Sequence, residues 1–220
     1  MPDCILAVDI GTTSVRAMVV DASGQPRAIA ARSNILHYPA PGLIEQDPEA
    51  LWTNVVEATK QALTEAGRSP SELCAIGVAA QRSSIVVWEK NTVSPLAPVV
   101  SWQDLRGIDA AAALQANGHL VTHQMAAAKL ESVIDRIDNG RARMRAGELA
   151  WGNVDTFVIA RLTGGRTHAM DLSQLSATGY FNYVDGLNED LVLAQNLDLS
   201  LFPTIGDTAQ NHGDTDPGVF

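Results

Sequence analysis

Basic residues are scarce in this 220-residue chain. Lys and Arg number 15 against 25 Asp and Glu, so the formal charge is −10 and the sequence pI is near 4.8. Affinity for nucleic acid depends on clustered cations, and the tightest cluster here is a short stripe of Arg141, Arg143 and Arg145. The balance therefore disfavours a nucleic-acid partner. It also gives no general attraction to anionic membranes, so any anionic ligand must be held by local groups.

Cysteine and long apolar runs are also scarce. The two cysteines, Cys4 and Cys74, each lie in an apolar, strand-like run, which favours small buried side chains in a reducing compartment over a disulfide. No CxxC pair indicates a zinc site. No window reaches the ~18 uncharged apolar residues of a spanning helix, and the first residues lack the features of a secretory signal. These absences predict a soluble, cytoplasmic protein with no membrane partner.

Hydrophobic residues nevertheless make up 46% of the chain, which is enough for a packed core. The first third predicts strands at residues 5–8, 15–20 and 27–35, joined by short polar links that permit only an antiparallel meander. A helix is predicted from the N-cap Asp47 to Gly67, because apolar residues recur on one helical face between them.

The run at residues 74–80 is continuously apolar, which is typical of a strand buried on both faces. Further strands are predicted at residues 85–88 and 99–102. From Gly107 onward the pattern turns helical, at residues 108–115, 125–137, 141–148, 154–162 and 187–197. This order predicts one α/β domain with a helical second half.

The sharpest local motif is the stretch from Asp9 to Arg16, between the first two predicted strands. Its loop at residues 11–14, Gly-Thr-Thr-Ser, offers backbone N–H groups and three hydroxyls in a tight space, which suits phosphate oxygens. Asp9 could hold Mg²⁺ through water, and Arg16 could reach a phosphate. A plain polar hairpin explains the same residues equally well.

Two polar segments follow later strands, where α/β sheets display ligand-binding groups. Gln81 and Arg82 could hydrogen-bond sugar hydroxyls, although an ordinary polar turn is the alternative. Trp102 could lie against the carbon face of a polyol while the next residues, Gln103 and Asp104, take its hydroxyls. The alternative there is a core Trp followed by a helix cap.

The order and spacing of these motifs resemble the FGGY carbohydrate kinases, the group of the glycerol, xylulose and gluconate kinases. Asp171, with Ser173 and Ser176 after it, resembles the TD…NAS segment of that family. The matching stretches are residues 7–21 (AVDIGTTSVRAMVVD), 38–52 (YPAPGLIEQDPEALW), 75–90 (AIGVAAQRSSIVVWEK), 98–107 (PVVSWQDLRG) and 147–165 (GELAWGNVDTFVIARLTGG). The resemblance is collinear from residue 5 to about residue 213.

The resemblance implies an actin-like ATPase (ribonuclease H-like) lobe. Residues 1–220 would form the sugar-binding N-terminal lobe, with a mixed sheet that starts with a three-strand antiparallel meander. The implied function is that of one lobe of an ATP-dependent carbohydrate kinase, which phosphorylates a primary hydroxyl of a polyol, ketose or sugar acid with ATP and Mg²⁺. The alternative is a non-catalytic lobe that binds a sugar or a protein.

The resemblance also implies which residues form the site. The residues expected to meet the ATP phosphates are Asp9, Gly11, Thr12, Thr13 and Arg16, with Mg²⁺ held by Asp9 through water. The residues expected to bind the sugar are Arg82, Ser83, Trp102, Gln103, Asp104 and Gln124. The neighbouring His123 is favoured as an incidental loop histidine.

Ser83 and Gln124 depart from the family pattern. Glycerol kinases carry Glu where this chain has Ser83 and Tyr near the position of Gln124, and xylulokinases carry Met-His in place of Arg82-Ser83. Losing a carboxylate from a hydroxyl site costs ~1–3 kcal/mol. These departures predict a substrate other than glycerol or xylulose.

Members of the family continue into a second lobe, which opens with a Gly-Asp-Gln-like segment that supplies the catalytic base. Asp207 and Asp214 precede that place, so the catalytic Asp is expected beyond Phe220 and no catalytic residue is assigned within the chain. The chain alone is therefore expected to show no kinase turnover. Its expected partner is the second lobe of a longer chain, or a second copy bound through the exposed lobe face.

Overall fold

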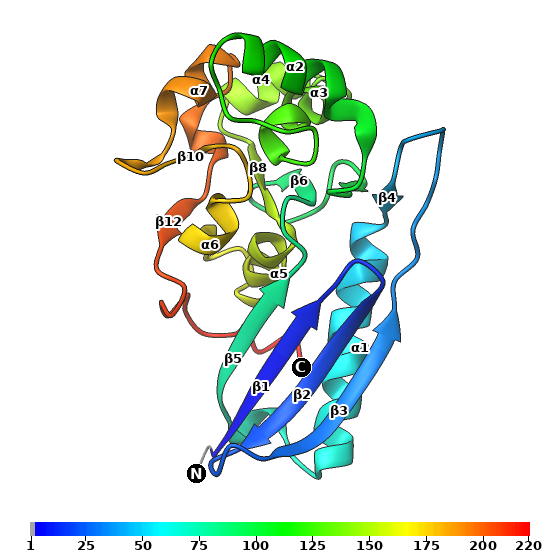
Figure 1. The fold of residues 1–220 in the computed structure, drawn as a ribbon. Coiled ribbons are helices and arrows are strands. Elements are labelled where there is room, and N and C mark those ends of the chain that lie inside the picture. The colour runs from blue at the N-terminus through cyan, green and yellow to red at the C-terminus, as the bar shows by residue number, and fades with distance from the viewer. Residues whose placement is uncertain (1–2) are drawn as a thin grey trace.

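The first sheet carries the N-terminal third of the molecule. The computed structural model describes residues 3–220. Strands β1 (Cys4–Ile10), β2 (Ser14–Asp21), β3 (Pro26–Ser33) and β5 (Leu73–Ala80) form a sheet in the order β3-β2-β1-β5 (Figure 1). The β1/β2 and β2/β3 pairs are antiparallel and β1/β5 is parallel. The predicted meander and mixed sheet are therefore confirmed.

Helix α1 (Pro48–Ala66) covers one face of this sheet (Figure 1). Its predicted ends are confirmed: the carboxylate of Asp47 accepts hydrogen bonds from the first-turn backbone, and Gly67 closes the helix at a φ of 63°. Every second residue of β1 is buried, because alternate side chains of a strand point to opposite faces. The remaining β1 side chains, including Asp9, point to the open face of the sheet.

Strand β5 is not buried on both faces, so that prediction was wrong. None of its residues is fully buried, because β5 is the edge strand of the sheet and only one of its faces packs on the core. Cys74 is consequently exposed, contrary to the expectation, whereas Cys4 is buried as predicted. Both thiols are free.

A second, antiparallel sheet continues from the first. It consists of β4 (Glu45–Gln46), β7 (Val99–Val100), β6 (Ile85–Glu89) and β8 (Leu149–Asn153), in that order. The predicted strand at residues 85–88 is confirmed as β6, and that at 99–102 is shortened to β7. All five residues of β8 are buried, and this strand was not predicted.

Short helices cover the second sheet, as Figure 1 shows in its upper half. The predicted helix at residues 154–162 is confirmed at both ends, but that at 125–137 is broken at Lys129, whose φ of −124° is not helical. The remaining elements are η1 (Pro70–Glu72), η2 (Leu105–Gly107), α2 (Ile108–Ala116), η3 (Ala126–Ala128), α3 (Leu130–Ile134), α4 (Gly140–Arg145), α5 (Val154–Leu162), β9 (Ala169–Asp171), α6 (Leu172–Leu175), β10 (Phe181–Asn182), β11 (Gly186–Leu187), α7 (Glu189–Ala194), η4 (Leu199–Leu201) and β12 (Thr204–Gly206). Among residues 3–220, no helix is long and apolar enough to cross a membrane.

Two hydrophobic cores lie within residues 3–220. The first lies between the first sheet and helices α1 and α5, and the second between the second sheet and the short helices. Strand β6 belongs to both cores: Val86 and Trp88 lie in the first, and Ile85 and Val87 in the second. The two halves are therefore joined through a shared strand.

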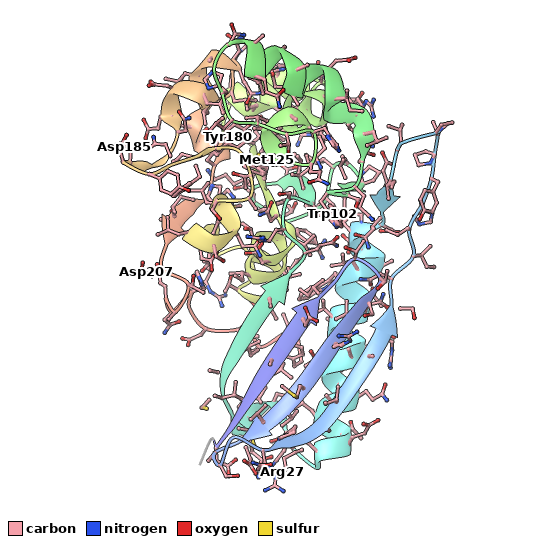
Figure 2. All side chains as sticks on the ribbon, viewed as in Figure 1. Arg27, Trp102, Met125, Tyr180, Asp185 and Asp207 are labelled. Atoms are coloured by element: carbon pink, nitrogen blue, oxygen red, sulfur yellow. The ribbon has the colours of Figure 1, made fainter. Side chains whose placement is uncertain are left out.

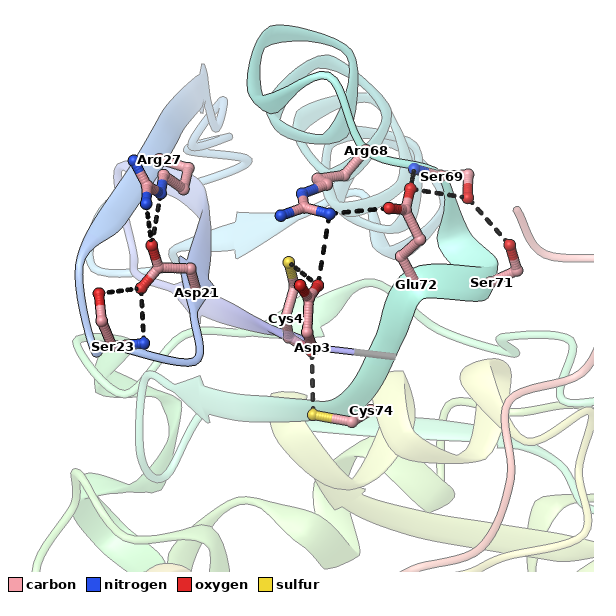
Figure 3. Close-up of polar contacts among 10 residues, drawn as sticks. All are labelled: Asp3, Cys4, Asp21, Ser23, Arg27, Arg68, Ser69, Ser71, Glu72 and Cys74. Atoms are coloured by element: carbon pink, nitrogen blue, oxygen red, sulfur yellow. Dashed lines mark hydrogen bonds and ion pairs between the residues drawn. The ribbon is translucent and has the colours of Figure 1, made fainter. Parts of the chain in front are cut away.

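The far end of the first sheet is closed by charged residues (Figure 3). Arg68 Nη1 lies 3.4 Å from Asp3 Oδ1 and 2.8 Å from Glu72 Oε1, and Arg27 pairs with Asp21 across a turn. Hydrogen bonds from Ser69 and Arg68 lower the pKa of Glu72 to about 2. The Arg68 contacts tie the start of β1 to the start of β5, at the end of the sheet away from the predicted motifs.

Candidate functional site

The predicted motifs meet at one end of the first sheet. Because β1 and β5 are parallel, both end at the same edge, where the Gln81 N–H donates to the Ile10 carbonyl at 2.9 Å. A cavity of about 660 Å³ opens there, between the two halves of the molecule. It is lined by Asp9, Gly11, Thr12, Ala80, Gln81, Arg82, Ser83, Trp102, Thr122, Gln124, Met125, Ser176 and Ala177. Figure 2 shows Trp102 and Met125 beyond the ends of these two strands.

The cavity brings together most of the predicted site residues. Of the expected phosphate-contacting residues, Asp9, Gly11 and Thr12 line it; of the expected sugar-contacting residues, Arg82, Ser83, Trp102 and Gln124 line it. The other four predicted residues, Thr13, Arg16, Gln103 and Asp104, lie outside the lining. The hairpin loop and both polar segments therefore share one hollow, which the functional interpretation requires.

The carbonyl groups of the hairpin loop are tied back into the protein. Asn34 Nδ2 donates to Gly11 O at 2.9 Å, and the Asn34 N–H donates to Thr13 O at 2.9 Å. Gln46 Nε2 donates to Thr12 O at 3.0 Å. The backbone N–H groups of Thr12 and Thr13, by contrast, make no hydrogen bond within residues 3–220. A loop that keeps its donors available while its acceptors are occupied is suited to an anion.

Glycine relieves a close backbone approach at position 11. A Cβ there would come within 3.2 Å of Ser14 O, the carbonyl to which the Gly11 N–H donates at 2.9 Å in closing the turn. A residue with a Cβ would have to push this carbonyl aside by a few tenths of an ångström. The tight loop that the motif predicts is thus formed by backbone contacts.

Asp9 and Arg16 lie beside this loop and are mostly exposed. Their charged groups are 3.9 Å apart, from Arg16 Nη1 to Asp9 Oδ2. Within residues 3–220 no group of three or more His, Cys, Asp or Glu side chains could hold a metal ion. A single accessible carboxylate fits a hydrated Mg²⁺ that is held mainly by phosphates and waters, and it does not fit a cage made only of protein ligands.

A hydrogen-bonded network connects the hairpin loop to both polar segments. Thr12 Oγ1 donates to Gln81 Oε1 at 3.1 Å and accepts from Trp102 Nε1 at 3.1 Å. Gln81 Oε1 also accepts from Ser84 Oγ at 3.0 Å, and Gln81 Nε2 donates to Gln46 Oε1 at 2.8 Å. The Gln81 amide is therefore used within the protein, and the Thr12 hydroxyl is occupied while its N–H is not.

Trp102 forms a fixed wall of the cavity. Its backbone N–H donates to Ser84 Oγ at 3.0 Å, and its indole N–H is directed at Thr12. The side chain is partly exposed and lines the cavity, so it is not a core Trp. An indole held at its polar end can present its apolar face to a ligand.

Arg82 and Ser83 lie on the turn after β5. Arg82 is exposed and forms no ion pair or hydrogen bond with other residues in the range 3–220. Ser83 is almost fully buried, adopts a φ of 61° and donates its hydroxyl to Ala177 O at 2.5 Å. The Arg82 guanidinium is thus available to a ligand, whereas the Ser83 hydroxyl already has an acceptor.

Asp104 is buried beneath the site. Its Oδ2 accepts from the Ile44 N–H at 2.6 Å, and its Oδ1 accepts from Arg106 Nε at 2.7 Å. Arg106 also reaches Glu45 at 2.6 Å. Burial alone would raise the pKa of Asp104, but hydrogen bonds from Arg106 and Ile44 outweigh it and lower the pKa. Asp104 therefore acts on the cavity only indirectly, by fixing the segment that carries Trp102.

Part of the cavity lining comes from residues that were not predicted to bind a ligand. Thr122, Met125 and Ala177 line the cavity, together with Ser176, which had been noted only as part of a family-like segment. Their residue types did not indicate a binding role, because the packing of the helical half of the chain brings them to the cavity. His123 does not line the cavity.

A second hollow of about 660 Å³ runs along the free edge of β5. The buried Asp155 lies in it, and desolvation raises the pKa of this carboxyl to about 7. Neither Asp155 Oδ1 nor His212 Nδ1 has a hydrogen-bond partner within residues 3–220. None of the predicted ligand-binding residues lies here.

The fold is that of the actin-like sugar kinases of known structure. A glycerol kinase from Plasmodium falciparum, solved with ADP, has a TM-score of 0.89 at 20% identity, over 98% of this chain and 45% of that chain. A xylulose kinase from Rhodospirillum rubrum has a TM-score of 0.82 at 24% identity, over 98% of this chain and 46% of that chain. At these identities the likeness shows the fold alone, and it confirms the predicted fold class.

Sequence similarity gives the family. Residues 4–220 match the FGGY family of carbohydrate kinases, N-terminal domain, and the chain therefore belongs to this family, as predicted. It is 37% identical to the glycerol kinases of Xanthobacter autotrophicus and Rhodospirillum centenum, over 98% and 99% of its own length. It covers 46% of each of those proteins, so it spans about half the length of these curated relatives.

Proposed function

We propose that this chain is the sugar-binding lobe, residues 1–220, of an ATP-dependent carbohydrate kinase that phosphorylates a primary hydroxyl of a polyol, ketose or sugar acid. The observation that carries the proposal is the shared cavity. Asp9 and the hairpin loop line it together with Arg82 and Trp102. A hydroxyl bound in this cavity lies next to donors suited to phosphate.

The substrate side of the cavity is proposed to work through three side chains. The Trp102 indole faces the carbons of the ligand, and the Arg82 guanidinium and the Gln124 amide hydrogen-bond its hydroxyls. Ser83 offers no carboxylate there, and its hydroxyl is bonded to Ala177. The missing carboxylate supports a substrate other than glycerol, because a partner for a substrate hydroxyl is lost. Arg82-Ser83 in place of the Met-His of the xylulokinases supports a substrate other than xylulose.

The phosphate side is proposed to work through the hairpin. The N–H groups of Thr12 and Thr13 receive phosphate oxygens, Gly11 permits their close approach, and Arg16 adds a positive charge. Asp9 fits a hydrated Mg²⁺, which supplies charge neutralisation during phosphoryl transfer when it is bound.

The catalytic base and the adenosine pocket are proposed to come from a second lobe of a longer chain. No residue of the present chain is assigned as the base, and Gln103 remains a predicted second contact to the sugar. Since the donor proposed is ATP, the proposed compartment is the cytoplasm, which supplies it.

Ligand binding by the 220-residue chain tests the proposal. The panel is glycerol, ribitol, D-ribulose and D-gluconate, followed by thermal shift and isothermal calorimetry. A ligand at 100 times its Kd should stabilise the fold by about 2.7 kcal/mol. We expect ribitol, D-ribulose or D-gluconate to bind more tightly than glycerol.

Arg82→Met should abolish the shift, while the matched control Arg136→Met, on an exposed surface outside the cavity, should not. If no member of the panel binds, or if Arg82→Met binds as well as the parent chain, the proposal is wrong. A chain that binds sugars and still gives no turnover when joined to an ATP-binding lobe would instead support a non-catalytic binding module.

A further inference from the structure

A lysine that the proposed function does not use lies directly behind the cavity. Lys129, between η3 and α3, is fully buried and is among the largest side chains in the molecule with no exposed surface. Moving an ammonium group out of water is costly, so a buried lysine remains only where other groups compensate its charge. Its surroundings therefore indicate what it does.

The Lys129 ammonium joins two segments of the cavity wall. Nζ donates to Ser101 O at 2.9 Å and to Ser83 O at 3.3 Å. Ser83 follows Arg82 on the turn after β5, and Ser101 precedes Trp102 at the end of β7. The Trp102 N–H donates to Ser84 Oγ, so the two segments also contact each other directly across 18 positions of sequence. Lys129 links them from a third part of the chain.

The stem of Lys129 is held from behind. A Cβ on Gly107 would come within 3.0 Å of Lys129 Cγ and 2.9 Å of Ala128 Cβ, so the chain packs against the stem at a residue without a side chain. The Lys129 N–H donates to Ala126 O at 2.8 Å, and Ser132 Oγ donates to Lys129 O at 2.7 Å. The ammonium is thereby fixed in place.

Charged neighbours act on Lys129 without pairing with it. It forms no ion pair within residues 3–220; Asp104 favours its charged form, and Arg106 disfavours it. Desolvation is the largest influence and lowers the pKa of Lys129 to about 7. The two carbonyl groups are thus its direct partners, and these bonds are of the kind that strengthen in a dry interior.

Ser83 is the residue that most needs this support. Its φ of 61° lies in the left-handed region, which a residue other than glycine holds only when its surroundings impose it. The Ser83 hydroxyl donates to the Ala177 carbonyl, and the Ser83 carbonyl accepts from the Lys129 ammonium. Without the ammonium, two buried carbonyls lose a donor and the turn is free to relax.

We infer that Lys129 is a positioning residue: its buried ammonium, by joining the Ser83 and Ser101 carbonyls, sets the spacing between Arg82 and Trp102. The inference rests on the proposed function, since these are the two side chains proposed to hold the sugar. Lys129 itself does not line the cavity and touches no ligand there. It acts by holding Arg82 and Trp102 at a spacing that fits one polyhydroxylated molecule.

The test measures ligand affinity at a matched folded fraction. Lys129→Met removes the donor and keeps the stem, and Lys129→Arg restores a charged donor. The probe is whichever of ribitol, D-ribulose or D-gluconate binds the parent chain most tightly. Kd is measured by calorimetry at a temperature where circular dichroism shows each variant at least ~95% folded. We expect the Kd of Lys129→Met to be at least ~10-fold higher than that of the parent chain. The Kd of Lys129→Arg should lie within ~3-fold of the parent value.

Leu63→Ala is the matched control for a loss of stability alone. Leu63 is buried in the first core at the end of α1, among the residues that pack on the far part of the sheet. This variant should melt earlier and keep the parent Kd. A merely structural role of Lys129 would make it behave like Leu63→Ala.

The inference is overturned if folded Lys129→Met keeps the parent Kd, or if Leu63→Ala weakens binding as much. If Lys129→Met does not fold, Lys129→Gln and Lys129→Arg carry the test: a weaker Kd for Gln than for Arg supports the inference, and equal Kd values overturn it. A parent chain that binds no probe overturns the proposed function and this inference together. Binding that is indifferent to residue 129 overturns the inference alone.

Discussion

Removing the carboxylate of Asp104 should destabilise the fold severely. In Asp104→Ala, the Arg106 guanidinium, whose side chain is only 5% exposed, keeps Glu45 as its one remaining ion-pair partner, and the Ile44 N–H loses its acceptor. Breaking a buried pair by removing one partner costs ~3–5 kcal/mol. Because a domain of this kind is stable by about 5–15 kcal/mol in total, the loss is a large fraction of it.

Urea unfolding followed by circular dichroism and tryptophan fluorescence measures the effect. The matched control is Asp109→Ala, which removes an exposed carboxylate from the first turn of α2 and should cost about 0.3–1 kcal/mol. A loss below ~1 kcal/mol for Asp104→Ala would refute the argument. If stability were kept while sugar binding disappeared, Asp104 would have to face the ligand after all.

The pH dependence of this interaction has a definite sign. The pKa of Asp104 is lowered in the folded state, so its contribution is fully present above the unfolded value near ~3.9. It is lost as the pH falls through the lower, folded value. The stability difference between the parent chain and Asp104→Asn should therefore shrink under acid conditions, which urea midpoints measured from pH 7 downward would show.

Three further predictions follow from the same structure. Burial raises the pKa of Asp155 to about 7, so folding takes up a proton between pH ~4 and ~7 and the stability of the fold decreases as the pH rises through that window. Above pH 7, Asp155→Asn should therefore be more stable than the parent chain by up to about 4 kcal/mol and should unfold at a higher urea concentration. Equal urea midpoints at about pH 8 would contradict this. Trp102→Phe keeps an aromatic face but loses the hydrogen bond to Thr12, so calorimetry should show a sugar affinity reduced about 3- to 10-fold. An unchanged affinity would show that the indole N–H has no part in placing the ring. Cys74 is exposed and Cys4 buried, so a chromogenic disulfide reagent should titrate one thiol in the native chain and two in urea; two fast native thiols would show that Cys4 is accessible.

Local signals explain why the first third of the fold was predictable. The meander of β1, β2 and β3 follows from short polar links, and the ends of α1 follow from Asp47 and Gly67, all of which act within a few residues. The prediction that β5 is buried on both faces was wrong, because the burial of an edge strand depends on which distant segments pack beside it. No local sequence pattern encodes those segments. Strand β8 was missed because its apolar run is short: only Leu149, Ala150 and Trp151 precede Gly152 and Asn153.

The sequence predicted which residues gather at the candidate site better than it predicted which of them contact the protein instead of a ligand. Arg82 and Trp102 were found because polar segments after strands commonly face ligands. Whether a polar side chain faces a ligand or the protein depends on distant partners: Asp104 bonds to Ile44, 60 positions away, and Gln81 to Gln46, 35 positions away. Lys129 gave no signal, since a lysine in a helical stretch ordinarily lies on the surface.

The strand shared by the two hydrophobic cores has a consequence for how the protein responds to heat and to ligand. Alternate side chains of β6 are embedded on opposite sides, so neither core can melt without exposing part of the other. Calorimetric unfolding should accordingly show a single cooperative peak. A small molecule seated where the two halves meet would raise the temperature of that whole transition.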